Sequence, residues 1–494
     1  MEIITADFFV LTLALVGVVI IVAALLSGLI RSSDLPQVGV FLAVGAMLGP
    51  AGLGLLHVTL DSAILRIVAT LSLVLVLFTD AVSLSIAEIR RHGTLAFRVL
   101  GPGTLLSAAL MSLAAWQLLD LSFPAAALLG AALASTDPVM LRGLLRRPGL
   151  PESVRLALRL ESGLNDAVLL PVILIAMPFL GRAEVFTNTA WARIGLELFL
   201  LGPGAGIAVG LLATSALEMI RRKTGVLRDY ESIYSLGVAF TAYAAAEAVH
   251  GSGFLAAFAA GLTIAALDVE LCDCFLEYGQ TTAEMALLFT FVLFGTSLIW
   301  TGFTVLSWPV ALFALLALLS RPVAFFISLA GTQLNFRSRL LIAWFGPRGL
   351  SSLLLILVPV FAAVPGTQPL FFICCFFVLL SIAVHGGSLM FLKREEPRPL
   401  AAAAGAESVP TDLPVQATSR DGAHAVDNLI TIPEMKAIQQ SGAPSLVLDV
   451  RAERSFGASD LHAQGAVRIS PDRAVESLKQ LGVSPETWLF AFCA

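Results

Sequence analysis

Apolar stretches of spanning length recur from Phe8 to Leu392, separated by short polar breaks. A helix needs about 20 apolar residues to cross the hydrocarbon core of a bilayer. The composition agrees, because 57% of the 494 residues are hydrophobic and only 13% are charged, against roughly 25% charged in ordinary soluble domains. Such a chain cannot bury its apolar surface in water. The sequence therefore predicts an all-α polytopic membrane protein whose main partner is membrane lipid.

The apolar stretches predict about thirteen transmembrane helices at ~20 residues each. In chain order they are Phe8–Ile30, Leu35–Leu53, Ile64–Ile86, Leu95–Leu119, Pro124–Leu145, Arg159–Leu180, Ile194–Ile220, Ser232–His250, Phe254–Leu267, Ala283–Ile299, Val305–Leu329, Leu340–Val360 and Leu370–Leu392. The residues before Phe8 are acidic and lack the positive region of a signal peptide, so the first stretch is interpreted as a retained helix.

Basic residues follow the odd-numbered spans and predict the orientation. They are Arg31, Arg90, Arg91, Arg142, Arg146, Arg147, Arg221, Arg222, Lys223, Arg228, Arg337, Arg339, Lys393 and Arg394. Lys and Arg are retained on the cytoplasmic side. We therefore expect a multi-pass protein of the cell inner (plasma) membrane, with its N-terminus outside and its C-terminus cytoplasmic. The acidic loop from Asp268 to Glu277 is the exception to this pattern.

The composition changes after the last span and predicts three regions. Residues 1–392 form the membrane domain, residues 393–427 are an Ala-, Pro- and Ser-rich linker, and residues 428–494 form a small cytoplasmic α/β domain. Strands are expected at Ser445–Val450 and Trp488–Phe492 in the last region. The net charge of -5, without a basic tract, argues against a nucleic-acid partner.

Two spans contain helix-breaking segments with charges. Ser135-Thr-Asp-Pro138 interrupts the fifth span and Gly346-Pro-Arg-Gly349 the twelfth. Irregular backbone at membrane depth is tolerated only where it is buried in protein or lines a cavity. The two spans are seven apart, so they run in opposite directions, which is typical of a transporter site between inverted repeats. An acid can compensate facing helix N-termini there, and a base facing C-termini.

A third segment, Glu161-Ser-Gly-Leu-Asn-Asp166, leads into the sixth span. Glu161 and Asn165 are four apart and share a helix face. Hard cations prefer oxygen ligands, which a carboxylate, a hydroxyl and freed backbone carbonyls supply. A carboxylate that binds either a cation or a proton couples the two fluxes by competition. Three other intramembrane charges, Glu247, Glu284 and Arg321, are interpreted as helix-end residues or members of structural ion pairs.

These three segments, with His250-Gly-Ser-Gly-Phe-Leu-Ala-Ala-Phe-Ala-Ala-Gly261, resemble in order the monovalent cation/proton antiporter-1 family, the NhaP-like sodium/proton exchangers. The resemblance covers Phe8 to about Leu392. It implies NhaA-like inverted repeats with crossed broken helices, and a homodimer with a six-helix core domain and a dimerisation domain. It also implies elevator-type exchange of Na⁺, or of K⁺ or Li⁺, for H⁺. No cofactor and no metal beyond the transported cation are expected.

The resemblance also implies roles for individual residues. Asp166 becomes the shared cation and proton site, with Ser162 and the backbone carbonyl of Thr136 as further ligands. Asn165, in place of a second aspartate, is similar to the electroneutral branch of the family. Asp80 falls where relatives often carry a glutamate, and either a ligand role or a structural polar role remains open for it.

Three further residues are similar to the family's polar network. Glu161 and Arg348 resemble its stabilising intramembrane pair, and Asp137 resembles the charge at its helix crossing.

The tail resembles a rhodanese-like domain through Leu448-Asp-Val-Arg451 and Phe492-Cys-Ala494. That likeness makes Cys493 the candidate sulfur-carrying nucleophile, although the chain stops one residue later, before the loop that would cradle it. Three functions remain for the whole chain: a secondary antiporter, which is no enzyme; a membrane-anchored sulfurtransferase or sulfur-sensing protein; and a channel. Thirteen helices are far more than an anchor needs, and a channel needs no titrating carboxylate at broken helices. The antiporter is therefore favoured.

Overall fold

The computed structural model describes residues 37–84, 86–145, 150–181, 188–223, 228–267 and 273–391, short tail segments at 444–450, 465–469 and 487–492, and a few isolated positions. The chain divides into two compact units, Met1–Arg398 and Pro399–Ala494. The first predicted span, the predicted linker and Cys493 lie outside these ranges, apart from isolated residues.

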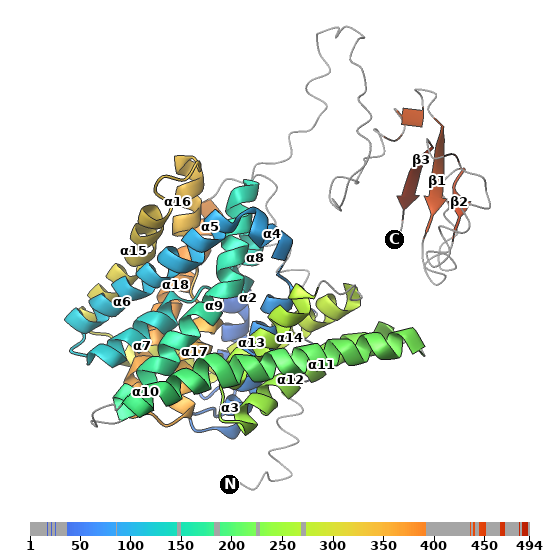
Figure 1. The fold of residues 1–494 in the computed structure, drawn as a ribbon. Coiled ribbons are helices and arrows are strands. Elements are labelled where there is room, and N and C mark those ends of the chain that lie inside the picture. The colour runs from blue at the N-terminus through green and yellow to red at the C-terminus, as the bar shows by residue number, and fades with distance from the viewer. Residues whose placement is uncertain are drawn as a thin grey trace, which may run out of the picture. The chain divides into compact units, whose positions relative to one another are not determined.

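The first unit is entirely helical in its described part (Figure 1). Its first half comprises α2 (Gln37–Leu48), α3 (Ala63–Val82), α4 (Ile86–Arg91), α5 (Gly93–Arg98), the π-helical turn η1 (Val99–Gly103), α6 (Thr104–Leu118), α7 (Phe123–Ala134), α8 (Pro138–Leu145) and α9 (Glu152–Gly181). Its second half comprises α10 (Asn188–Gly195), the π-helical turn η2 (Leu196–Leu201), α11 (Gly202–Lys223), α12 (Arg228–Ala248), α13 (Gly253–Ala266), α14 (Asp273–Thr296), the 3-10 helix η3 (Leu298–Val305), α15 (Trp308–Ser328), α16 (Phe336–Trp344), α17 (Leu350–Phe361) and α18 (Thr367–Phe391).

Many of these helices meet the requirements of a membrane span. Among the described residues, seven are long and apolar enough, and an eighth span forms if the bent pair of α14 and η3 is counted as one. Shorter apolar helices, α2, α13 and α17, lie among them. The helical polytopic membrane fold predicted from the sequence is confirmed. The number thirteen stays a prediction, because the first span lies outside the described residues and several others are broken into pieces shorter than a bilayer.

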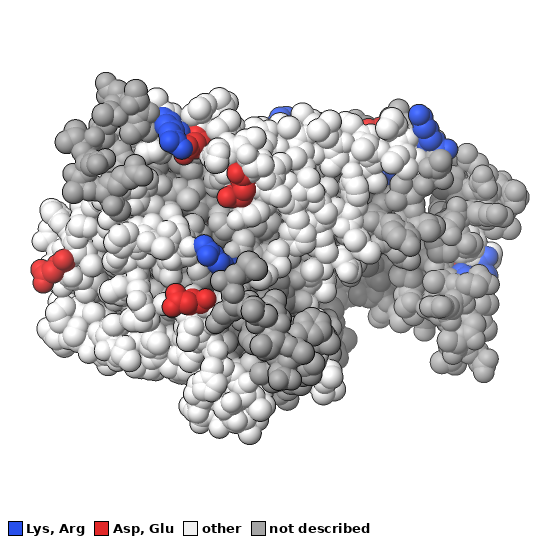
Figure 2. All heavy atoms as spheres, turned by 90° about the horizontal axis from the view of Figure 1, so that it is seen from below, with Lys and Arg blue, Asp and Glu red and all other residues white. Residues whose placement is uncertain are grey.

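The outer surface of the bundle is suited to lipid. Large apolar side chains are exposed on α11, such as Leu212, and on α15, such as Leu315 and Ile327. Charged side chains on the face seen in Figure 2 stand singly or in small groups on a mainly uncharged surface. Exposed apolar area of this extent is rare on soluble monomers, so these surfaces are suited to a membrane rather than to water.

The helices pack in two groups. One group joins α6 to α7 and α15, α7 to α9 and α17, and α17 to α18. The other joins α3 to α13 and α14, α2 to α14, and α11 to α12 and α13. The groups meet chiefly where α3 contacts α9 and α17, and η3 reaches α18. Both broken helices belong to the first group.

The contact between α2 and α14 depends on glycines. A Cβ added at Gly45 would lie 2.2 Å from the carbonyl oxygen of Val292, and one at Gly295 would lie 2.4 Å from that of Leu42. Small residues allow two membrane helices to approach until their backbones touch, which maximises van der Waals contact where no hydrophobic effect drives association.

The tail unit contains a small parallel sheet. Strand β1 (Ser445–Asp449) pairs with β3 (Trp488–Phe492) on one side and with β2 (Val467–Arg468) on the other. Both predicted strands are therefore confirmed, and their parallel order is that of an α/β fold. The rhodanese likeness remains a prediction.

The close contact of α2 with α14 leads to a first prediction. Gly45→Ala should lower the melting temperature of the detergent-solubilised protein, because overpacking a tight contact costs about 1–3 kcal/mol. Gly39→Ala in the same helix is the matched control, since an added Cβ there meets nothing within 4 Å. Equal melting temperatures for the two variants would contradict the tight packing of this contact.

Candidate functional site

The first helix break lies between α7 and α8, at residues 135–137. Pro138 opens α8, because proline lacks the N–H that a first helical residue would leave unpaired. The proline ring also disfavours helical backbone at Asp137, the residue before it. The side chains of Ser135, Thr136 and Asp137 are all buried. The chain therefore leaves the helix inside the protein with three polar side chains around it.

The second break, at residues 345–349, separates α16 from α17 and lies against the first. The backbone N–H of Asp137 donates to the carbonyl of Pro347 at 2.9 Å. A Cβ at Gly349 would lie 2.0 Å from Asp137 Oδ2, so only glycine permits this approach. The breaks predicted in the fifth and twelfth spans are thus present and in direct contact.

Asp137 compensates two helix N-termini at this junction. Its Oδ1 accepts from the N–H of Val139 at 2.8 Å, in the first turn of α8. Its Oδ2 accepts from the N–H of Leu350 at 2.8 Å, the first residue of α17. Both N–H groups lack partners within their own helices, and the positive ends of both helix dipoles face this carboxylate.

Two arginines compensate the opposite helix ends. Arg348 donates to the carbonyls of Ala134, at 2.7 Å, and Ser135, at 3.1 Å, at the C-terminus of α7. Arg321, from α15, donates to the carbonyls of Ile342 at 2.6 Å and Ala343 at 2.5 Å, near the C-terminus of α16. Both guanidinium groups are buried. Each of the four inner helix ends therefore meets a charge of the opposite sign.

The predicted pairing of Glu161 with Arg348 is wrong. Glu161 instead forms a buried two-point ion pair with Arg321, with Nε to Oε1 at 3.2 Å and Nη2 to Oε2 at 2.5 Å. Arg348 is engaged by the carbonyls of α7, whereas Arg321 reaches Glu161 while it compensates α16. The interpretation of Arg321 as a member of a structural ion pair is confirmed. The sequence pointed to a partner for Arg321, because it is the sole charged residue between Val305 and Leu329.

Asp166, on α9, lies beside the junction of the breaks. The hydroxyl of Ser135 donates to its Oδ1, and Ser351 is a second hydrogen-bond partner. Asp166 is 3% exposed, and within the described ranges it forms no ion pair. The sequence prediction did not include Ser135 or Ser351 as partners, although Ser135 stands in the first break. Asp166 is thus a buried carboxylate whose hydrogen-bond partners, in the part of the chain that the structure describes, are hydroxyl groups.

Asn165 and Thr136 join α9 to the first break. The amide of Asn165 donates to the hydroxyl of Thr136 at 2.6 Å, while its own Oδ1 is buried without a hydrogen-bond partner among the described residues. Ser162 donates to the carbonyl of Arg159 at 3.4 Å. The roles of Ser162 and of the Thr136 carbonyl as cation ligands stay predictions.

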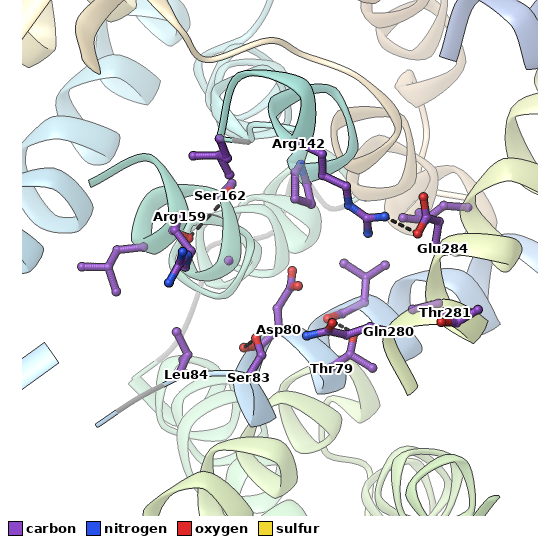
Figure 3. Close-up of a pocket in the computed structure, with 17 residues that line it drawn as sticks. Thr79, Asp80, Ser83, Leu84, Arg142, Arg159, Ser162, Gln280, Thr281 and Glu284 are labelled. Carbon is purple, nitrogen blue, oxygen red and sulfur yellow. Dashed lines mark hydrogen bonds and ion pairs between the residues drawn. The ribbon is translucent and has the colours of Figure 1, made fainter. Parts of the chain in front are cut away.

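A cavity of about 540 Å³ opens beside this cluster (Figure 3). Its polar lining comes from four helices and includes Thr79, Asp80, Ser83, Arg142, Ser162 and Glu284. Figure 3 shows the Asp80 carboxylate directed into the space below Ser162 and Arg142. Gly163, on α9, also lines the cavity, three residues before Asp166 on the same helix. The cavity is therefore lined by the stretch of α9 that precedes Asp166.

No metal centre was identified in the described part of the chain, where no three His, Cys, Asp or Glu side chains gather.

A helical membrane bundle with two broken helices and a buried carboxylate at their junction is typical of secondary ion transporters. A sequence profile described as "Sodium/hydrogen exchanger, transmembrane" matches residues 16–394. The chain therefore belongs to the sodium/hydrogen exchanger family of transmembrane proteins.

Individual relatives agree with this membership. The chain is 29% identical over 379 residues to the K⁺/H⁺ antiporter NhaP2 of Shewanella sp. strain MR-4, covering 74% of this chain and 64% of that protein. It is 27% identical over 300 residues to the Na⁺/H⁺ antiporter NhaH of Halobacillus dabanensis, covering 58% of this chain and 72% of that protein. The chain thus spans 64% of the length of the first of these relatives.

A solved structure shares the fold. The sodium proton antiporter MjNhaP1 of Methanocaldococcus jannaschii superposes with a TM-score of 0.64 at 21% identity, covering 78% of this chain and 100% of that chain.

The ion pair of Glu161 with Arg321 leads to a second prediction. Arg321→Ala should sharply reduce the yield and thermal stability of folded protein, because stranding one partner of a buried pair costs about 3–5 kcal/mol. Arg193→Ala is the control, since it breaks an ion pair with Glu197 in which the arginine side chain is 75% exposed. Wild-type melting of the Arg321→Ala protein would contradict a structural role for the buried pair.

Proposed function

We propose that the protein exchanges a monovalent cation, K⁺ or Na⁺ (with Li⁺ as a third candidate), for H⁺ across the membrane. One observation carries the proposal: of the two carboxylates on α9 that point into the protein, one is neutralised and one is not. Glu161 is paired with Arg321, whereas Asp166 has hydroxyl partners and no ion pair within the described ranges. A buried carboxylate without an ion-pair partner gains strongly from binding either a proton or a metal cation.

Coupling follows from competition for Asp166. When the carboxylate holds a proton it cannot hold a cation, so each movement of the site carries one or the other. The hydroxyl of Ser135 and freed backbone oxygens of the first break supply further oxygen ligands for a hard cation. Asn165 adds no charge, and its amide is engaged by Thr136. The site therefore exchanges one cation for one proton, which is electroneutral.

Access to the site alternates between the two sides of the membrane. The cavity opens at the C-terminal end of α3, beside Asp80 and Ser83. At the N-terminal end of α3, Arg66 donates to the carbonyl of Phe361 at the end of α17 and lies 5.7 Å from the ring centroid of Phe361. Contacts at this end join the two packing groups, and the cavity lies at the other end. A rigid movement of the group that carries α7, α8, α9, α16 and α17 would close the cavity at its present end and open one at the other end.

The remaining assignments follow the sequence. The positive loops place the open end of the cavity on the cytoplasmic side, the N-terminus outside and the tail in the cytoplasm. Two copies assemble as a homodimer through the group that carries α11, α12 and α13. The relatives named above include both a K⁺/H⁺ and a Na⁺/H⁺ antiporter, so both ions are primary candidates for the cargo.

Asp166→Asn tests the function directly and is our third prediction. In everted vesicles with a preset pH gradient, wild-type protein should collapse the gradient when K⁺ or Na⁺ is added. Asp166→Asn should abolish this response without loss of folded protein, because the amide cannot exchange a proton for a cation. Asp61→Asn, which alters an exposed carboxylate, should respond as the wild type. Exchange retained by Asp166→Asn would refute the site.

Ser135→Ala is our fourth prediction. It removes a hydroxyl from the Asp166 carboxylate, and hydrogen bonds to charged groups contribute about 1.5–3 kcal/mol. We expect the KM for the cation to rise about tenfold or more. Ser107→Ala is the matched control, because the hydroxyl of Ser107 is also buried but has no hydrogen-bond partner among the described residues. An unchanged KM in Ser135→Ala would remove Ser135 from the site.

A further inference from the structure

One ion pair crosses the mouth of the cavity. Arg142 Nη1, from α8, contacts Glu284 Oε2, from α14, and Figure 3 shows the two side chains meeting above Asp80. Helix α8 otherwise packs on α9 and α2, whereas α14 packs on α2, α3 and α12. The pair therefore spans the opening between the two packing groups. Both side chains are only partly buried, at 35% and 26% exposed.

The lining of the cavity contains as many basic as acidic side chains. Arg142 and Arg159 supply two positive charges to its lining, and Asp80 and Glu284 supply two negative charges. Arg142 and Asp80 line the same cavity, and Figure 3 shows both side chains in it. If Glu284 lost its charge, two arginines would face one aspartate on the path of an incoming cation.

We propose that Glu284 holds Arg142 away from Asp80, so that this tethered guanidinium does not compete with the transported cation for entry to the site. Glu284 and Arg142 are thus positioning residues for cation uptake from the cavity side. The proposal rests on the proposed function, because it assigns a role within cation exchange.

Two physical arguments support this role over a stabilising one. A partly exposed ion pair contributes little to stability, typically 0–1 kcal/mol, because solvent screens it. A charge fixed beside a binding site, by contrast, acts at a high effective concentration, as any tethered competitor does. An arginine on a flexible side chain next to a carboxylate is such a competitor for a monovalent cation. The pair should therefore alter cation uptake while leaving the fold unchanged.

The test is the apparent KM for K⁺ and for Na⁺, with the maximal rate, measured from each side in everted and right-side-out vesicles. Glu284→Gln should raise the KM on the cavity side about fivefold to tenfold, the size expected from one partly screened charge, with little change in maximal rate. Arg142→Gln should lower the KM, because it leaves Glu284 as an unpaired anion at the mouth. The double variant Arg142→Gln with Glu284→Gln should return to within about twofold of wild type.

Matched controls separate charge from shape and from general effects. Arg142→Lys keeps the positive charge and should keep the wild-type KM. Glu197→Gln breaks the exposed ion pair with Arg193 outside the cavity and should leave the KM unchanged. Size-exclusion profiles establish that each variant is folded.

Two results would overturn the proposal. A double variant with a KM as high as that of Glu284→Gln would mean that Glu284 attracts the cation directly and that Arg142 does not compete. A KM raised by Arg142→Gln alone would reverse the expected sign, and this variant can be read even if Glu284→Gln fails to fold. Absence of exchange in the wild type would instead refute the proposed function, so the two failures are distinguishable.

Discussion

The interaction on which this structure depends is the compensation of four helix ends inside a membrane protein. Two helices stop midway and leave backbone N–H and C=O groups where water is scarce, and each unsatisfied group costs several kcal/mol. The carboxylate of Asp137 accepts hydrogen bonds from the N-termini of α8 and α17. Arg348 donates to the carbonyls at the C-terminus of α7, and Arg321 to those near the C-terminus of α16. The breaks are stable because each of these side-chain charges is opposite in sign to the helix end that it faces, so the two attract.

The same arrangement creates the site. The charge of Arg321 is neutralised by Glu161, and its guanidinium group also donates to a carbonyl of α16. The positive charge of Arg348 is directed at the carbonyls of α7. Asp166 is therefore left beside the breaks with hydroxyl partners and, among the described residues, without an ion-pair partner. A charged group in this position is expensive for the fold, and this cost is the basis of the proposed exchange of a proton for a cation at Asp166.

Charged side chains also lie at the boundary between the two packing groups. Arg142 and Glu284 bridge the groups at the open end, and Arg66 reaches the end of α17 at the other. Polar contacts of this kind are weak enough to break when the groups move, in contrast to the glycine-mediated contact of α2 with α14. The two groups are also joined by close packing, because η3 lies against α18 with Gly302 touching the backbone of Phe376.

The sequence by itself determined the membrane fold, the two helix breaks and the chemical type of the site. The length of an apolar stretch is a local signal, because the thickness of the bilayer is the same for any chain. A proline next to a charged residue within such a stretch is also a local signal, because proline always lacks the N–H that a helix interior needs. Only the tertiary structure decided which charges meet. In the structure, Glu161 pairs with Arg321 and not with Arg348. Ser135 donates a hydrogen bond to Asp166, and Glu284 of α14 pairs with Arg142. Such pairings depend on how helices far apart in sequence are rotated and packed, and spacing along one chain carries no information about that rotation.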